Sequence, residues 1–547
     1  MKNFKYLFSL TLASLLLTGC IVVGEEGGLE LSESIDCDPS SRPFGGGSGT
    51  ASEPYALCSP DHFYNMEYHS EYFVMAKDID FSGETLSNGI DFYGTLDGNY
   101  KKLSNITMNN SNAFSYVGVF GYLGNANISL LTIENINLTV SDTVAYSIGG
   151  LAGAAYSSVI SRVSVSGSIY YGGGMTGTRL GGIVGTLETS SSINQSTSTS
   201  TISGYEYVGG IAGYANSSYL YDSISTSPIN GQTYVGGEVG FANNSHTYRA
   251  NFYGSITSSG FQIGGIVGTL QNGSTISEAK SASGWIGGYQ YVGGIAGNST
   301  TGSIISSSKN ESYINTTGQF TGGIVGEIDG GSLNYNLNTG TIVSTNSYIG
   351  GIAGRVGQTS STVFYRNRNY GGGINQANSL VSQDYVGGLV GYLSSGTNII
   401  ENMSAARVRG INYVGGLFGY IEGSNTIVES YLPGVLGSPS AIDGSSEVGG
   451  FAGFVAVGTT IQNSYVATNV SGTNRGGFVG TSSSGTYVNC YWNDDFVFDG
   501  APPSGISGLN STEMQVESNF AGFDFTNTWI VWNQGGAAIR PMFRWEM

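Results

Sequence analysis

Histidine is scarce in this chain, and its three copies are the first candidates for chemistry. His62 and His69 lie near Asp61 and Glu67, a grouping that could hold a metal ion; a surface or cap role is the simpler interpretation. None of the three histidines belongs to a His-Glu-x-x-His motif, so the signature of a zinc protease is absent from the sequence. No Ser/His/Asp set can be assembled either.

Acidic residues offer a second kind of chemistry. Asp494, Asp495 and Asp499 lie in one short segment, and carboxylate oxygens are preferred ligands of calcium, so calcium is the one cofactor that the sequence suggests. Within the repeats the acids stand singly, as at Glu206 and Asp222. A β-helix polysaccharide lyase or glycoside hydrolase needs paired carboxylates, or a basic group beside calcium-binding acids. We therefore predict no catalytic residues and no enzymatic activity, with such a carbohydrate-active enzyme as the alternative.

One segment combines basic and aromatic side chains. Tyr365, Arg366, Arg368 and Tyr370 occur together in the widest interval between copies of the repeat described below. This segment could contact an anionic glycan, although a solvated loop is the simpler interpretation.

The first twenty residues resemble a bacterial lipoprotein signal. A short basic stretch precedes an apolar run too short to span a bilayer, and Leu17-Thr18-Gly19-Cys20 follows at once. This pattern predicts a signal peptide over residues 1–19 and lipidation of Cys20, which would anchor the chain in a membrane without a transmembrane helix. Because Ile21 rather than Asp follows, analogy favours the bacterial outer membrane, with the chain facing the surface or the periplasm. An ordinary signal peptide with a chance cysteine is the alternative.

Three further cysteines remain for the folded chain. In an oxidising compartment we expect Cys37 and Cys58 to form a disulfide, worth about 2–4 kcal/mol where the fold begins. Cys490 is then expected to be a buried free thiol. Reduced, buried cysteine at all three positions is the alternative.

A repeated phrase organises the rest of the sequence. Tyr207-Val208-Gly209-Gly210-Ile211-Ala212-Gly213 recurs in thirteen copies, most often about 28 residues apart, and three short β-prone runs fill each interval. This period predicts an all-β fold, a parallel β-solenoid of about 13 rungs and about 28 residues per rung, with a right-handed β-helix as the favoured form. Val208, Ile211 and Ile224 are expected to stack inside. The recurring Gly should allow close backbone approach or a positive φ.

The flanks of the repeat set the expected domain boundaries. We expect a flexible tether at 20–46, an N-terminal cap with the first strands at 47–110, the solenoid at 111–485 and an aromatic-rich C-terminal cap at 486–547. Aromatic residues crowd the last thirty positions, which predicts that they plug the last rung. A carbohydrate-binding platform is the alternative for this cluster.

Composition limits the partners. The formal net charge of −19, with no basic patch to override it, excludes nucleic acid as a partner. Only 10% of residues are charged, which leaves long faces of Ser, Thr, Asn and Tyr.

The repeat resembles the GLUG motif of a family of bacterial surface proteins. The phrase at 207–213 looks like that motif, and its copies cover roughly residues 116 to 480. The segments at 78–81 and 520–529 look like those that usually flank such repeats. The motif also occurs beside the metallopeptidase domain of IgA-specific proteases, whose zinc signature this sequence lacks. The resemblance implies a solenoid at the cell surface, and we predict adhesion: binding of a glycan or surface protein through many weak contacts.

Overall fold

The computed structural model describes residues 35–86, 89–110, 115–141, 146–174, 176–357, 361–375, 382–434, 442–496, 498–499, 501–534 and 537–547. One compact unit spans Asp36–Met547. The expected signal peptide and the lipidation site at Cys20 lie outside the described residues. Among the described residues, no helix has the length and apolar character needed to cross a membrane.

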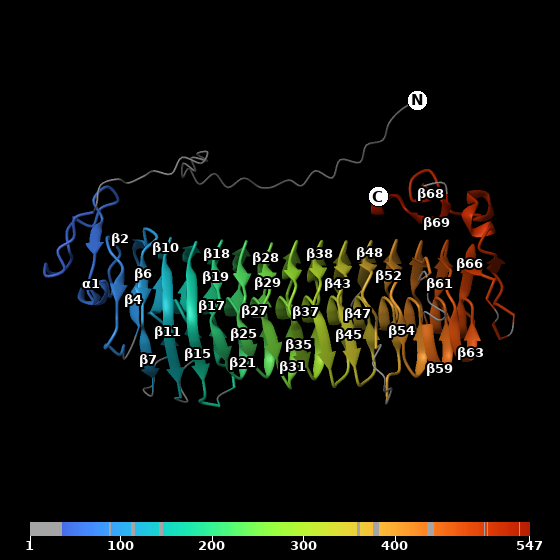
Figure 1. Ribbon diagram of the computed structural model, residues 1–547, viewed down its shortest axis with the longest axis horizontal. Coiled ribbons are helices and arrows are strands. Elements are labelled where there is room, and N and C mark those ends of the chain that lie inside the picture. The colour runs from blue at the N-terminus through green and yellow to red at the C-terminus, as the bar shows by residue number, and fades with distance from the viewer. Residues whose placement is uncertain are drawn as a thin grey trace, which may run out of the picture. The chain divides into compact units, whose positions relative to one another are not determined.

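The described chain is a stack of parallel β-rungs (Figure 1). A complete rung contains β21 (Glu206–Gly209), β22 (Ala212–Asn216), β23 (Tyr219–Tyr221), β24 (Ile224–Ser225) and β25 (Pro228–Asn230). Each of these strands pairs in parallel with the equivalent strand one rung further on. The stack has about 13 turns of about 29 residues, so the predicted β-solenoid is confirmed.

The rung divides into five short strands rather than the three that the sequence suggested. Residues with positive φ interrupt the extended backbone: Tyr207 at 49°, Ser217 at 50° and Asp222 at 54°. Equivalent residues of successive rungs adopt the same conformation, so each bend recurs along the stack. Short polar side chains tolerate this left-handed region through local hydrogen bonds, but a tyrosine there is uncommon. The tyrosine of the repeated phrase is therefore the residue at the bend.

The paired glycines are explained by close contact, not by positive φ. A Cβ on Gly209 would lie 2.0 Å from the carbonyl oxygen of Ala212. A Cβ on Gly210 would lie 2.1 Å from both the carbonyl oxygen of Gly237 and the hydroxyl oxygen of Ser225. Real Cβ atoms cannot approach other atoms so closely, so this corner of the rung requires glycine.

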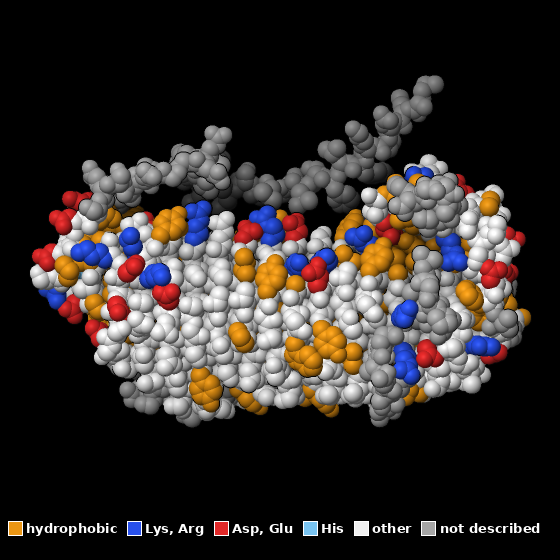
Figure 2. Space-filling model, viewed as in Figure 1, with side chains coloured by type: hydrophobic (Ala, Val, Ile, Leu, Met, Phe, Trp, Pro, Cys, Tyr) orange, Lys and Arg blue, Asp and Glu red, His pale blue; other side chains and the backbone are white. Residues whose placement is uncertain are grey.

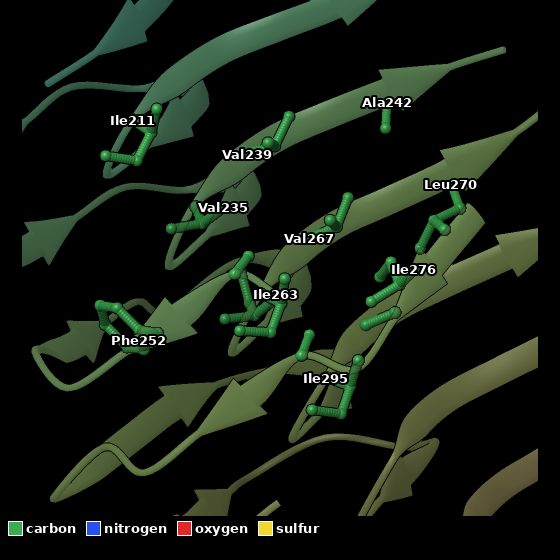
Figure 3. Close-up of a cluster of buried hydrophobic side chains, with 14 of the residues drawn as sticks. Ile211, Val235, Val239, Ala242, Phe252, Ile263, Val267, Leu270, Ile276 and Ile295 are labelled. Atoms are coloured by element: carbon green, nitrogen blue, oxygen red, sulfur yellow. The ribbon is translucent and has the colours of Figure 1, made fainter. Parts of the chain in front are cut away.

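The solenoid interior contains the expected aliphatic ladders with one correction. Val208 and Ile211 are fully buried, and Figure 3 shows Ile211 pointing into the stack together with Val235, the equivalent of Val208 in the next rung. Ile224, predicted to be internal, is instead 37% exposed. The positive φ of Asp222 reverses the alternation of side chains, so Ser223 and Ser225 face inward in its place.

Polar side chains also form ladders inside the stack. Amide groups of buried asparagines hydrogen-bond from rung to rung, with N···O distances of 2.8 to 3.0 Å. The two series are Asn310–Asn338–Asn369 and Asn336–Asn367–Asn402. Because each internal amide both donates and accepts, these ladders avoid the cost of buried, unpartnered polar groups.

The ordered N-terminal cap begins before residue 47, inside the segment 20–46 that we expected to be a flexible tether. Cys37 and Cys58 form the expected disulfide, and Phe44 is buried against the first rungs. Helix α1 (Pro60–Tyr64) follows, with the Ser59 hydroxyl accepting from the N–H of His62 at its start. The segment 36–46 therefore belongs to the cap, because a disulfide and a buried ring fix it.

The C-terminal aromatic residues do not plug the last rung, contrary to the prediction. Strands β68 (Trp529–Gln534) and β69 (Ala537–Phe543) form an antiparallel hairpin that lies along the outside of the stack (Figure 1). Trp529 and Phe543 pack on the outward-facing Tyr431, and Trp529 also contacts Tyr465. Both tyrosines are buried as a result. These rings are buried against outer tyrosines of the stack, in a cluster separate from the aliphatic interior.

Candidate ligand-binding surfaces

The predicted basic–aromatic segment lies on the outer face of the stack, next to the C-terminus. Tyr365 ends β48 (Thr362–Tyr365), and Arg366 follows at a bend with φ of 55°. The Arg366 side chain donates to the carboxylate of Glu401 on the next rung at 2.7 Å. Its guanidinium carbon also lies 4.8 Å from the ring centre of Tyr365. The positive charge of Arg366 is thus already paired within the protein.

The C-terminal helix η3 (Arg544–Glu546) covers the other half of this segment. The hydroxyls of Tyr370 and Tyr431 donate to the Glu546 carboxylate, each at 2.8 Å. The guanidinium of Arg368, which begins β49 (Arg368–Asn369), lies 5.3 Å from the ring centre of Trp545. The four predicted contact residues are therefore together, but the anions at this segment are two carboxylates of the same chain, Glu401 beside Arg366 and Glu546 beside Tyr370.

The three predicted calcium ligands do not converge. Asp495 accepts from the backbone N–H of Ser511 at 2.8 Å, and its hydrogen bonds to Ser511 lower the pKa of this carboxyl. Asp499 pairs instead with Arg475 at 3.5 Å. Asp494 packs beside the backbone of Gly508. Because each carboxylate has a separate neighbour, the structure does not assemble a calcium site from these three.

Histidine and the remaining cysteine have structural roles. His62 is fully buried, with Nε2 3.0 Å from the carbonyl oxygen of Ser41. Cys37, Cys58 and His62 are the single group of three potential metal ligands within the described ranges, and its two sulfurs are bonded to each other. His246 stacks on Tyr219 at the surface of the stack. Cys490 is the buried free thiol that we expected, and burial raises its pKa to about 12.

The structure reveals an exposed aromatic pair that sequence reasoning missed. Trp285 begins β35 (Trp285–Gly288) and Tyr313 begins β40 (Tyr313–Thr316), the equivalent strand of the next rung. Their ring centres are 5.6 Å apart at 32°, and the two residues are 40% and 36% exposed. The indole nitrogen of Trp285 lies against Gly287, where a Cβ would be only 2.7 Å away. We call Trp285 and Tyr313 the aromatic platform, because Gly287 lets the indole lie along the sheet with its outer side exposed.

Charged residues flank the aromatic platform. Glu311, two residues before Tyr313, pairs with Lys280 at 2.9 Å and with Lys309 at 2.5 Å. Few charges occur elsewhere along the middle of the face shown in Figure 2, which is mostly polar and uncharged. This combination of exposed rings and hydrogen-bonding side chains is typical of surfaces that bind sugars or proteins.

The tyrosines of the repeated phrase form a ladder of their own. Tyr207 and Tyr234 stack at 4.7 Å and 9°, and Tyr385 and Tyr413 stack at 5.1 Å and 4°. The pKa of Tyr207 is raised to about 12, mainly because the ring is partly buried and secondly because the negative charge of Glu206 is near. Because the ring faces cover one another, a stacked tyrosine presents its edge and hydroxyl to solvent. Most of this ladder therefore stabilises the stack and does not offer ring faces to a ligand.

One acid breaks the aliphatic interior. Glu238 occupies the position that Ile211 and Ile266 hold in the neighbouring rungs, and it is fully buried. Its carboxylate lies close to the hydroxyl of Ser223 and the backbone N–H of Ser225, but neither contact has the geometry of a full hydrogen bond. Burial raises the pKa of Glu238 to about 8, although the nearby Ser223 and Ser225 lower it in part. The group is therefore mainly protonated at neutral pH.

Comparisons with known proteins give limited matches. No family model matches the chain, so the resemblance to GLUG-motif proteins rests on the motif residues. An alignment of 158 positions that covers 25% of the chain is 30% identical to halomucin from Haloquadratum walsbyi, but it covers only 2% of that protein's length. A crystal structure of a putative immunoglobulin A1 protease from Bacteroides ovatus aligns over 92% of this chain and 95% of its own, at 15% identity and a TM-score of 0.21. The chain is a β-solenoid by its strand pairing, and part of its sequence is similar to a short part of halomucin.

Proposed function

We propose that this protein is a non-catalytic binding rod that attaches a bacterial cell to an extracellular or cell-surface glycan or protein. The observation that supports the proposal best is the aromatic platform of Trp285 and Tyr313, whose exposed rings lie on adjacent rungs. Ring faces bind the C–H faces of sugars and the apolar parts of proteins, and neighbouring hydroxyl and amide groups supply hydrogen bonds. A rigid stack that repeats such contacts gains affinity through multivalency.

The proposed location is the cell surface, with the chain anchored through lipidated Cys20. The lipoprotein signal pattern at 17–20 supports the anchor, and the local match to halomucin supports an extracellular setting. Replacing Cys20 with Ala and fractionating the cells tests this location. The variant should leave the membrane fraction, and its continued retention there would contradict lipid anchoring.

Acids in the repeats are consistent with a binding role. Asp222 pairs with Arg249 of the next rung at 2.5 Å, and Glu327 pairs with Arg355 of the next rung at 3.1 Å. A lyase or hydrolase would need carboxylates that face one another across a substrate. Pairing with arginine makes each acid part of the inter-rung packing instead. Release of reducing or unsaturated ends from a bound polysaccharide would favour the enzyme alternative.

The binding role can be tested by measuring binding of the purified protein to a glycan array and to a panel of surface proteins. Trp285→Ala should weaken the signal that the unaltered protein gives for ligands bound at the aromatic platform. Tyr170→Ala is the matched control, since Tyr170 is 47% exposed and lies against Gly172 on a distant rung. Equal loss of binding in both variants, or no loss in either, would argue against the aromatic platform.

A further inference from the structure

The tyrosine ladder of the repeated phrase is interrupted at one rung. Gln262, in β31 (Phe261–Gly264), occupies the position between Tyr234 and Tyr291. Tyr234 stacks on Tyr207 on its other side, and Tyr291 stacks on Phe320 at 5.0 Å. Stacked rungs are about 4.8 Å apart, so the inner faces of Tyr234 and Tyr291 lie roughly 10 Å from each other. No aromatic side chain among the described residues fills this gap.

The floor of the gap is polar, whereas the floor beneath Tyr207, Tyr385 and Tyr413 is aromatic. A ladder ring normally contacts two outward-facing residues of the sheet beside it, as Tyr385 contacts Tyr392 at 5.5 Å and Tyr420 at 5.7 Å. By the same register, Gln262 lies over Thr269 and Asn298.

These two floor residues carry oxygens without partners. Thr269, in β32 (Val267–Gln271), is fully buried, and its Oγ1 has no hydrogen-bond partner. The Oδ1 of Asn298, in β37 (Ala296–Thr300), is also buried and unpartnered. Buried polar atoms normally find partners, so two in adjacent rungs beneath one gap point to a group that enters from outside.

The surroundings of the gap carry no net charge. Asn298 is followed on its ladder by Glu327 and then Arg355, which neutralise each other at 3.1 Å. The Gln262 side chain makes no hydrogen bond to another described residue, so moving it aside breaks no contact of that kind. The gap therefore suits a neutral ligand that replaces the glutamine side chain between the two rings.

We infer that the gap between Tyr234 and Tyr291 binds one neutral pyranose ring, with sugar hydroxyls bonded to Thr269 Oγ1 and Asn298 Oδ1. The two ring faces would cover the C–H faces of the sugar, and the floor oxygens would receive the partners that they lack. A flat aromatic ligand would occupy the gap but leave both oxygens unsatisfied. The inference rests on the proposed binding function and adds a second site, separate from the aromatic platform.

Gln262→Tyr is the most informative variant, because it should close the gap without harming the fold. Gln262 has a φ of 61°, and the ladder tyrosines on either side have φ values of 55° and 57°, so a tyrosine fits the backbone there. The new ring would continue the stack from Tyr234 to Tyr291. The thermal unfolding midpoint of Gln262→Tyr should therefore equal or exceed that of the unaltered protein. Thr269→Val removes the floor hydroxyl with little change of shape.

The probes are the methyl glycosides of glucose, galactose, mannose and N-acetylglucosamine, each measured by saturation-transfer NMR with the full-length chain. We expect at least one to bind, with affinity at least tenfold weaker in Gln262→Tyr, reduced in Thr269→Val and unchanged in Trp285→Ala. Equal binding to the unaltered protein and Gln262→Tyr, or binding of none of the four, would overturn the inference. Loss of binding in Trp285→Ala alone would also overturn it, while leaving the proposed binding function intact.

Discussion

Replacing Glu238 with Gln should remove a large pH dependence from the stability of the stack. The glutamine side chain has nearly the same size and is never charged, so the change isolates the cost of ionising a buried carboxyl. In the folded state the pKa of Glu238 is raised to about 8 from the ordinary glutamate value of 4.5, chiefly by burial. Ser223 and Ser225 lower this pKa in part, and neither residue is charged. The shift therefore arises from desolvation and not from a neighbouring ion.

The sign of the effect follows from proton binding. Between pH 4.5 and pH 8 the folded chain keeps the Glu238 proton while the unfolded chain has lost it. The free energy of unfolding therefore falls as pH rises, by about 1.4 kcal/mol per pH unit across this window. The window covers 8 − 4.5, or about 3.5 units, which gives a total of about 5 kcal/mol. The stabilisation is complete below pH 4.5 and is lost as pH passes through 8.

Guanidinium denaturation of the full-length chain at pH 5 and pH 9 measures this effect. Other acids also titrate, so the relevant quantity is the pH-dependent loss of stability in the unaltered protein minus that in Glu238→Gln. We expect a difference of about 4 kcal/mol, because a small part of the transition lies below pH 5. Glu238→Ile, which restores the residue type of the adjacent rungs, should show the same reduced pH dependence and be more stable throughout. Identical pH dependence in all three proteins would refute the assignment of a buried, unpaired carboxyl.

Three further changes test the packing. Replacing Cys37 and Cys58 with Ser should cost about 2–4 kcal/mol in the stability of the N-terminal cap, and limited proteolysis would show earlier cleavage there; unchanged cleavage would count against the disulfide's role. Gly210→Ala places a Cβ 2.1 Å from a carbonyl oxygen, so denaturation should show a loss of about 3 kcal/mol or more, and a neutral result would mean that the rung corner can open. Asn338→Ala leaves amide groups of its ladder neighbours unpartnered and should cost about 1–3 kcal/mol per orphaned group, whereas a stable variant would show that water replaces the amide.

The fold could be predicted from the sequence because one physical requirement recurs in nearly every rung. Gly210 and its equivalents must admit a facing side chain and a neighbouring carbonyl, so the same phrase marks the same corner each time. The inward or outward direction of individual side chains was harder to predict. Ile224 belongs to a β-prone run, but a single residue at positive φ, Asp222, reverses the alternation just before it.

The candidate sites depend on contacts that the sequence does not display. Trp285 and Tyr313 become neighbours only when their strands are placed in register, and an alignment of equivalent rung positions would have found them. The docking of Glu546 on Tyr370 joins residues 176 positions apart, and Glu546 lies outside the repeat, so no period could reveal this contact. Conversely, Asp494, Asp495 and Asp499 are close in sequence, yet bends in the chain direct them to different partners.

The central claim is that the rod binds its ligand through exposed aromatic rings without altering that ligand. The most direct test titrates the unaltered protein and Trp285→Ala with the glycan or protein that the array selects, and analyses the ligand by mass spectrometry after prolonged incubation. We predict saturable binding by the unaltered protein, at least tenfold weaker binding by Trp285→Ala, and a ligand of unchanged mass. Undiminished binding by Trp285→Ala, or a ligand cleaved during incubation, would contradict the account.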